Sequence, residues 1–111
     1  MSKIATLRSR IETPDLTADL HLYPSEQGGR KLSIDIGWGC PCAPGNAATD
    51  CWDGYPLLDT TMLPGERRRV GFFFLSGADA VNAIRPHGKF YLRESRVIGE
   101  AIIIADRFST P

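Results

Sequence analysis

Three cysteines and two histidines are the residues of this chain that could hold a metal ion or carry thiol chemistry. Cys40, Cys42 and Cys51 lie close together in the sequence, and a histidine as fourth ligand would complete a Cys₃His zinc site. Their spacing argues against this, because zinc knuckles use C-x₂₋₄-C and redox pairs use C-x-x-C rather than C-x-C. Free cysteine also fills small apolar pockets. The sequence therefore favours thiols without a metal and keeps a small zinc or thiol protein as an alternative.

The residues that usually build an active site are scattered. His21 and His87 are far apart in the sequence, and neither lies beside a nucleophile elbow. The glutamates Glu94 and Glu100 fall in a predicted hairpin next to arginines, where cross-strand pairing explains them. No G-x-x-x-x-G-K-[ST] phosphate loop is present, so we expect no bound nucleotide. The sequence predicts neither catalysis nor a cofactor.

Aromatic residues stand in a segment that is otherwise typical of a loop. Trp38, Trp52 and Tyr55 lie in or beside residues 37–54, which are rich in Gly, Pro, Asn and Asp. Long loops of this kind are often functional, and exposed aromatics often contact a partner. Covering a barrel end is the equally open alternative. The run 67–69, three arginines, is predicted to be a solvated strand edge rather than a phosphate clamp.

Alternating apolar residues predict the strands that would carry these side chains. The expected strands are residues 5–12, 18–23, 32–36, 55–58, 70–75, 89–93 and 97–105. A hairpin is expected around Gly28 and Gly29, and a short helix from Ser76 toward Ile84, where it would cover one face of strand 70–75. Six or seven short strands favour an all-β fold, a closed antiparallel six-stranded barrel with one short helix. Residues 1–111 are expected to form this one domain.

Composition limits the function classes. The chain has 13 basic and 13 acidic residues, whereas proteins that grip phosphate backbones carry a basic excess. No apolar run approaches the length that spans a bilayer, and we expect no signal peptide. An odd number of cysteines without an export signal predicts reduced thiols and a cytoplasmic location.

Three stretches, in order, resemble the third domain of bacterial elongation factor Tu, its C-terminal β-barrel. They are Leu20-His-Leu-Tyr-Pro-Ser-Glu-Gln-Gly-Gly-Arg30 running on to Gly37-Trp38 and Pro41, then Leu63-Pro-Gly-Glu66, and finally Phe90-Tyr-Leu-Arg-Glu94 with Arg96-Val-Ile-Gly99. They resemble the family's Glu-Glu-Gly-Gly-Arg segment, its Pro-Gly-Asp turn and its Phe-Ala-Ile-Arg-Glu-Gly-Gly-Arg-Thr-Val-Gly ending. The resemblance spans about residues 18–106 and implies the same barrel.

In that family the barrel helps to hold aminoacyl-tRNA and packs against a GTPase domain. The family's arginines map onto Arg30, Arg93 and Arg96. Other positions differ, because Cys40-Pro41-Cys42 replaces Arg-Pro-Gln, Ser95 replaces two glycines, and residues 43–51 resemble an insertion. These differences fall where RNA would bind, so tRNA is a disfavoured partner.

The resulting hypothesis is a non-enzymatic interaction domain that binds a protein. Its partner-binding residues would be Arg30, Trp38, Trp52, Tyr55, Arg93 and Arg96. A relative of a translation-factor barrel could act by mimicry, which would suit a translation- or immunity-related role. The alternatives are the zinc or thiol protein using Cys40, Cys42 and Cys51, and a tRNA-binding module.

Overall fold

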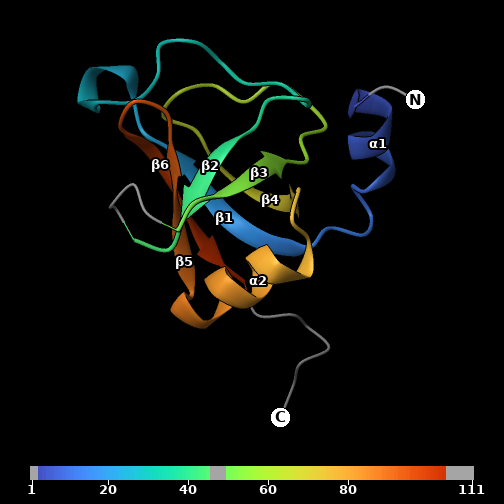
Figure 1. Ribbon diagram of the computed structural model, residues 1–111. Coiled ribbons are helices and arrows are strands. Elements are labelled where there is room, and N and C mark those ends of the chain that lie inside the picture. Colours follow the sequence, from blue (N-terminus) through green and yellow to red (C-terminus); the bar gives the residue numbers. More distant parts are fainter. Residues whose placement is uncertain (1–2, 46–49, 105–111) are drawn as a thin grey trace.

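The computed structural model, which describes residues 3–45 and 50–104, confirms the closed antiparallel barrel of six strands (Figure 1). The strands follow one another around the barrel in the order β1-β4-β3-β2-β5-β6, and β6 pairs back onto β1. Their bounds are β1 Leu16–Leu22, β2 Cys40–Ala43, β3 Trp52–Pro56, β4 Arg67–Phe74, β5 Lys89–Arg93 and β6 Val97–Ile103. Two α-helices, α1 Lys3–Ser9 and α2 Ala78–Ile84, and two 3-10 turns, η1 Ser25–Gln27 and η2 Arg85–His87, complete the described chain.

The core lies inside the barrel, because alternate residues of each strand point inward. In β4 the inward residues are Val70, Phe72 and Phe74, all buried. Phe90 from β5 meets the rings of Phe72 and Phe74 edge-on, at centroid distances of 5.0 and 5.8 Å. Such edge-to-face contacts add to the apolar burial. The strands expected at 18–23, 70–75, 89–93 and 97–105 are therefore confirmed as β1, β4, β5 and β6.

Helix α2 confirms the helix predicted after Ser76 and closes one end of the barrel (Figure 1). Its buried residues, Ala80 and Ile84, belong to the core. Gly77 precedes the helix, and no side-chain hydrogen bond caps it. This helix does not cover the outer face of β4, contrary to the sequence-based expectation.

The first predicted strand, residues 5–12, is wrong, because residues 3–9 form helix α1. Ile4, Leu7 and Ile11 also fit the i, i+3, i+7 spacing of a helix. Leu7 is buried, and the guanidinium of Arg10 lies 5.0 Å from the ring centroid of Phe73. The N-terminal segment thus provides the cover that the apolar outer face of β4 requires.

Asp15 attaches this segment to the barrel. Its carboxylate accepts a 2.8 Å hydrogen bond from the backbone N–H of Phe74 and forms an ion pair with Arg10 at 2.7 Å. The side chain is largely buried, so both contacts are protected from water. The attachment places α1 beside β3 and β4.

The hairpin expected around Gly28 and Gly29 is also wrong. Strand β1 pairs with β4 and β6, and the expected strand 32–36 makes only one bridge, Ile34 to Met62. Residues 37–54 are not one loop, because β2 and the start of β3 form a hairpin in which Cys42 pairs with Trp52. The strand expected at 55–58 therefore runs from residue 52 to residue 56. The final hairpin, β5 and β6, is confirmed, although Ala105 lies outside the described residues.

The three arginines at 67–69 begin β4, where they pair with His21, Leu20 and Asp19 of β1, whereas the pairing of β4 with β3 begins only at Phe72. Arg67 and Arg69 are exposed and Arg68 is half-buried. Among the described residues, no helix is long and apolar enough to cross a membrane.

Candidate interaction site at the loop end of the barrel

The end of the barrel opposite α2 is built from long connections, which we call the loop end. It comprises residues 23–39, residues 57–66 and the β5–β6 turn at residues 94–96 (Figure 1). Loops carry binding residues more often than the strands that support them. Several of the predicted partner-binding residues meet here.

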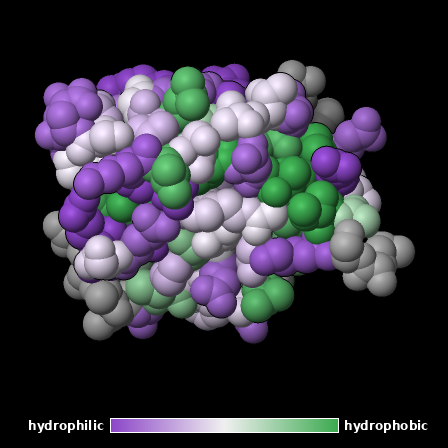
Figure 2. Space-filling view, turned by 90° about the horizontal axis from the view of Figure 1, so that it is seen from above, coloured by the Kyte–Doolittle hydropathy of each residue, from purple (hydrophilic) through white to green (hydrophobic). Residues whose placement is uncertain are grey.

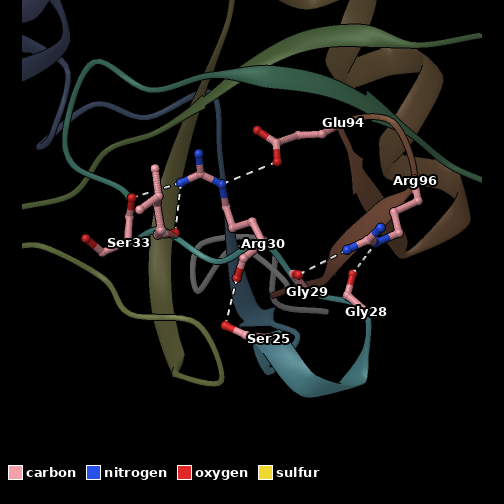
Figure 3. Close-up of polar contacts among 8 residues, drawn as sticks. Ser25, Gly28, Gly29, Arg30, Ser33, Glu94 and Arg96 are labelled. Carbon is pink, nitrogen blue, oxygen red and sulfur yellow. Dashed lines mark hydrogen bonds and ion pairs between the residues drawn. The ribbon is translucent and has the colours of Figure 1, made fainter.

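Arg30 organises this end through four side-chain contacts, and Figure 3 shows its hydrogen bonds and its ion pair. Its Nη1 donates to the carbonyl oxygens of Leu32 at 2.9 Å and Ser33 at 2.8 Å. Its Nε lies 3.3 Å from the carboxylate of Glu94, and its guanidinium lies 5.3 Å from the ring centroid of Trp38. Because the fork of arginine is planar and rigid, these contacts fix the direction of the segment that follows.

Arg96 holds the same segment from the other side. Its Nε donates to the carbonyl oxygen of Gly28 at 2.6 Å, and its Nη2 reaches that of Gly29 at 3.4 Å. Figure 3 shows both arginines directed toward residues 28–33. We call Arg30, Glu94 and Arg96 the arginine clasp, since they join residues 28–33 to the β5–β6 turn.

The glycine inside the clasp is required by close packing. A Cβ atom on Gly29 would lie 1.9 Å from the carbonyl oxygen of Tyr23, well inside any possible contact. The backbone N–H of Gly29 donates to the Pro24 carbonyl at 3.0 Å, and Ser25 Oγ donates to the Arg30 carbonyl at 3.0 Å. The loop is therefore tightly folded on itself.

Residues 59–66 are held in a similar way by Arg68. Its Nη1 and Nη2 donate to the carbonyl oxygens of Thr60 and Thr61, and Nη2 lies 2.7 Å from the carboxylate of Glu66. Glu66 in turn accepts a hydrogen bond from the backbone N–H of Leu63. That bond and Arg68 lower the pKa of the Glu66 carboxyl group. The second loop is thus ordered by charge-assisted hydrogen bonds, which are stronger than neutral ones.

Two leucines project from these ordered loops. Leu32 is 71% exposed and Leu63 is 59% exposed. The loops lie side by side, because Ile34 and Met62 exchange two backbone hydrogen bonds of 2.9 Å. Figure 2 looks onto this end and shows hydrophobic side chains among polar ones. A patch of exposed apolar side chains rimmed by polar residues is typical of a binding surface.

The structure brings together only part of the predicted partner-binding set. Arg30, Trp38 and Arg96 meet at the loop end, and Arg93 ends β5 beside the turn that completes the clasp. Trp52 lies on β3 opposite Cys42 and packs against the core. The ring of Tyr55 lies 6.1 Å from that of Phe73 and 5.0 Å from Lys3 Nζ. Trp52 and Tyr55 therefore belong to the barrel wall rather than to a projecting loop.

Leu32 and Leu63 were missed from the sequence. Leu32 falls in the expected strand 32–36, and only the Ile34–Met62 bridge shows that this segment lies outside the ladder. Leu63 was noted only as part of a turn motif. Sequence alone does not distinguish an exposed leucine from a buried one, although the adjoining Pro64-Gly65 indicates a turn.

The cysteines are not arranged as a metal site. Cys40 and Cys42 are both buried in β2, and Cys51 is exposed. A hydrogen bond to Cys40, together with burial, raises the pKa of the Cys42 thiol well above its usual value, whereas zinc binds the thiolate. Within residues 3–45 and 50–104 no three His, Cys, Asp or Glu side chains form a group that could hold a metal ion.

No protein-family model matches this chain, and no curated protein is significantly similar to it in sequence. The likeness to the elongation factor barrel therefore stays a prediction carried by the quoted motifs. The function has to be argued from the site itself.

Proposed function

We propose that this protein is a non-enzymatic interaction domain that binds a protein partner through its loop end. The observation that carries the proposal is the pair Leu32 and Leu63, which are strongly exposed although the loops beneath them are ordered by Arg30 and Arg68. A pre-ordered loop loses little conformational entropy on binding, so more of the contact energy remains as affinity. The partner should present an apolar pocket to the two leucines.

The arrangement favours a protein partner over tRNA. The side chain of Arg30 is only 17% exposed and is occupied by Glu94 and two carbonyl oxygens. Arg96 is likewise bound to carbonyl oxygens. Arginines that hold their own loops have few donors left for phosphate, and phosphate contacts supply most of the affinity for nucleic acid.

The resemblance to a translation-factor barrel suggests which partners to test first. We propose that the partner is a cytoplasmic protein that also meets the elongation factor, so that this chain acts by mimicry in translation or in immunity. This part of the proposal rests on the sequence motifs and not on the loop-end geometry.

Affinity capture from host-cell extract with three matched baits tests the proposal. The double variant Leu32→Ser, Leu63→Ser should lose a partner that the wild-type protein enriches. The control is Leu75→Ser, since Leu75 is 64% exposed but follows β4 at the opposite end. Retention of the same partner by the double variant, or its loss with Leu75→Ser, would contradict the proposed surface.

A further inference from the structure

A second candidate site lies on the outer wall of the barrel, where four strands align their exposed side chains in two rows. The register places Arg67 opposite His21, His21 opposite Glu100, and Glu100 opposite Tyr91. The next outward row runs Arg69, Asp19, Ile102 and Lys89 across the same strands. Directly opposed residues on one face are close enough to interact.

The β4, β1 and β6 part of this wall is hollowed. The hollow has a volume of about 330 Å³ and is lined by Asp19, Leu20, His21, Arg67, Arg68, Arg69, Glu100 and Ile102. Small-molecule sites typically measure about 300–1,000 Å³. The hollow thus has the size of a small ligand or a single side chain.

Most charges in the hollow are already matched. Arg69 Nε lies 3.2 Å from the carboxylate of Asp19. Glu100 accepts a 2.9 Å hydrogen bond from the hydroxyl of Tyr23, and burial together with that bond raises the pKa of Tyr23 to about 12. Tyr23 therefore stays protonated and continues to donate to Glu100.

Arg67 is different, because it has no ion-pair partner in the part of the chain that the structure describes. Its cross-strand neighbour is His21, whose pKa is lowered by burial and by the charge of Arg67. A neutral imidazole does not repel Arg67 and can donate one N–H. The hollow thus offers one unmatched cation beside a hydrogen-bond donor.

Ile102 supplies an apolar surface in the same hollow, since its side chain is 51% exposed. It lies on β6, two strands from Arg67, which corresponds to about 10 Å at the usual strand spacing. We propose that the hollow binds a small monocarboxylic acid whose carboxylate pairs with Arg67 and whose short apolar chain lies toward Ile102.

The neighbouring acids decide between carboxylate and phosphate. Asp19 and Glu100 line the hollow, and like charges at such distances are unfavourable. A phosphate carries up to twice the charge of a carboxylate and brings no apolar group for Ile102.

NMR titration of the labelled protein with hexanoate tests this site. Hexanoate should shift the backbone amides of residues 19–21, 67–69 and 100–102 with a dissociation constant on the order of 1 mM. Hexanamide, which lacks the charge, and acetate, which lacks the chain, should each bind at least about fivefold more weakly. Arg67→Gln should weaken hexanoate binding about tenfold or more, whereas the control Arg85→Gln, on η2, should not change it.

Several outcomes would overturn the inference. Hexanoate could leave these amides unshifted, inorganic phosphate could bind as tightly as hexanoate, or Arg67→Gln could bind like the wild-type protein. The peptide acetyl-Leu-Glu-Leu-amide binding about tenfold more tightly would identify a protein segment as occupant and exclude the small acid. The double variant Leu32→Ser, Leu63→Ser should bind hexanoate normally, because this site does not depend on the loop end.

Discussion

Replacing Arg30 by alanine would remove the centre of the arginine clasp. The variant loses the hydrogen bonds to the Leu32 and Ser33 carbonyls, the ion pair with Glu94 and the contact with Trp38. The barrel strands themselves are untouched, so the variant should still fold. We expect a clear loss of stability together with loosening of residues 24–33.

The size of the loss follows from the surroundings of each contact. The part-buried bond to the Ser33 carbonyl involves a charged donor, for which about 1.5–3 kcal/mol is typical. The bond to the Leu32 carbonyl is exposed, and water replaces it at a cost of about 0.5 kcal/mol. The exposed ion pair contributes about 0–1 kcal/mol, and the contact with Trp38 about 0.5–1 kcal/mol. The free energy of unfolding should therefore fall by about 2.5–5.5 kcal/mol.

Urea denaturation followed by circular dichroism measures this change. With a slope of about 2 kcal/mol/M, the midpoint should fall by about 1–3 M. The matched control is Arg69→Ala, whose ion pair with Asp19 is well exposed, so its cost should stay below about 1 kcal/mol. Arg30→Lys keeps the charge without the fork, so its free energy of unfolding should fall by most of the loss expected for Arg30→Ala. Equal midpoints for Arg30→Ala and Arg69→Ala would refute the clasp.

Four further outcomes follow from individual contacts. Gly29→Ala should lower the melting temperature more than Gly28→Ala, since a Cβ at Gly29 meets the Tyr23 carbonyl. Gly28, at φ 90°, has open space, so its replacement by alanine costs only about 1–2 kcal/mol. Equal melting temperatures would contradict the packing. The fold lowers the pKa of His21, which faces Arg67, Glu100 and Tyr23. The folded protein therefore keeps its full stability above pH 6.5, where His21 is neutral, and loses stability as the pH falls and His21 must be protonated. Wild-type protein should thus lose more stability between pH 7 and pH 5 than His21→Gln, as denaturation at each pH would show; parallel losses would rule out this role. Iodoacetamide should modify native Cys51 well before Cys42, because Cys42 is buried with a raised pKa. Mass spectrometry of the labelled peptides measures the order, and earlier labelling of Cys42 would refute this expectation. Filter binding near 150 mM salt, where the Debye length is about 8 Å, should show no submicromolar affinity for tRNA, and such an affinity that is lost in Arg30→Ala would restore the RNA alternative.

The sequence predicted the barrel because five of its elements carry strong local signals. The strands β1, β4, β5 and β6 alternate or are apolar throughout, and α2 follows a helical pattern that ends at Pro86. The short strand β2 was missed, since Cys40-Pro41-Cys42 has weak strand propensity and suggested chemistry instead. Helix α1 was mistaken for a strand because three apolar residues in a short segment fit both periods.

The site was predictable only in part, for a physical reason. Arg30 and Arg96 carry the family motif, so their importance could be inferred, but not that they bind backbone carbonyls within the chain. The contacts that join this segment to the β5–β6 turn, Arg30 with Glu94 and Arg96 with Gly28, link residues more than sixty positions apart. The exposure of Leu32 depends on the same long-range contacts. The two rows on the outer wall likewise follow from the register of four strands, which no local pattern specifies.

The most direct test of the loop-end surface is the affinity of a purified partner, once captured, for single leucine variants. Calorimetry should show that Leu32→Ser weakens binding at least about tenfold, a loss of about 1.4 kcal/mol that is expected of a central apolar contact. Leu75→Ser, of similar exposure at the other end, should leave the affinity within about twofold of the wild-type value. Unchanged affinity with Leu32→Ser, or a greater loss with Leu75→Ser, would contradict the proposal that the partner binds at the loop end.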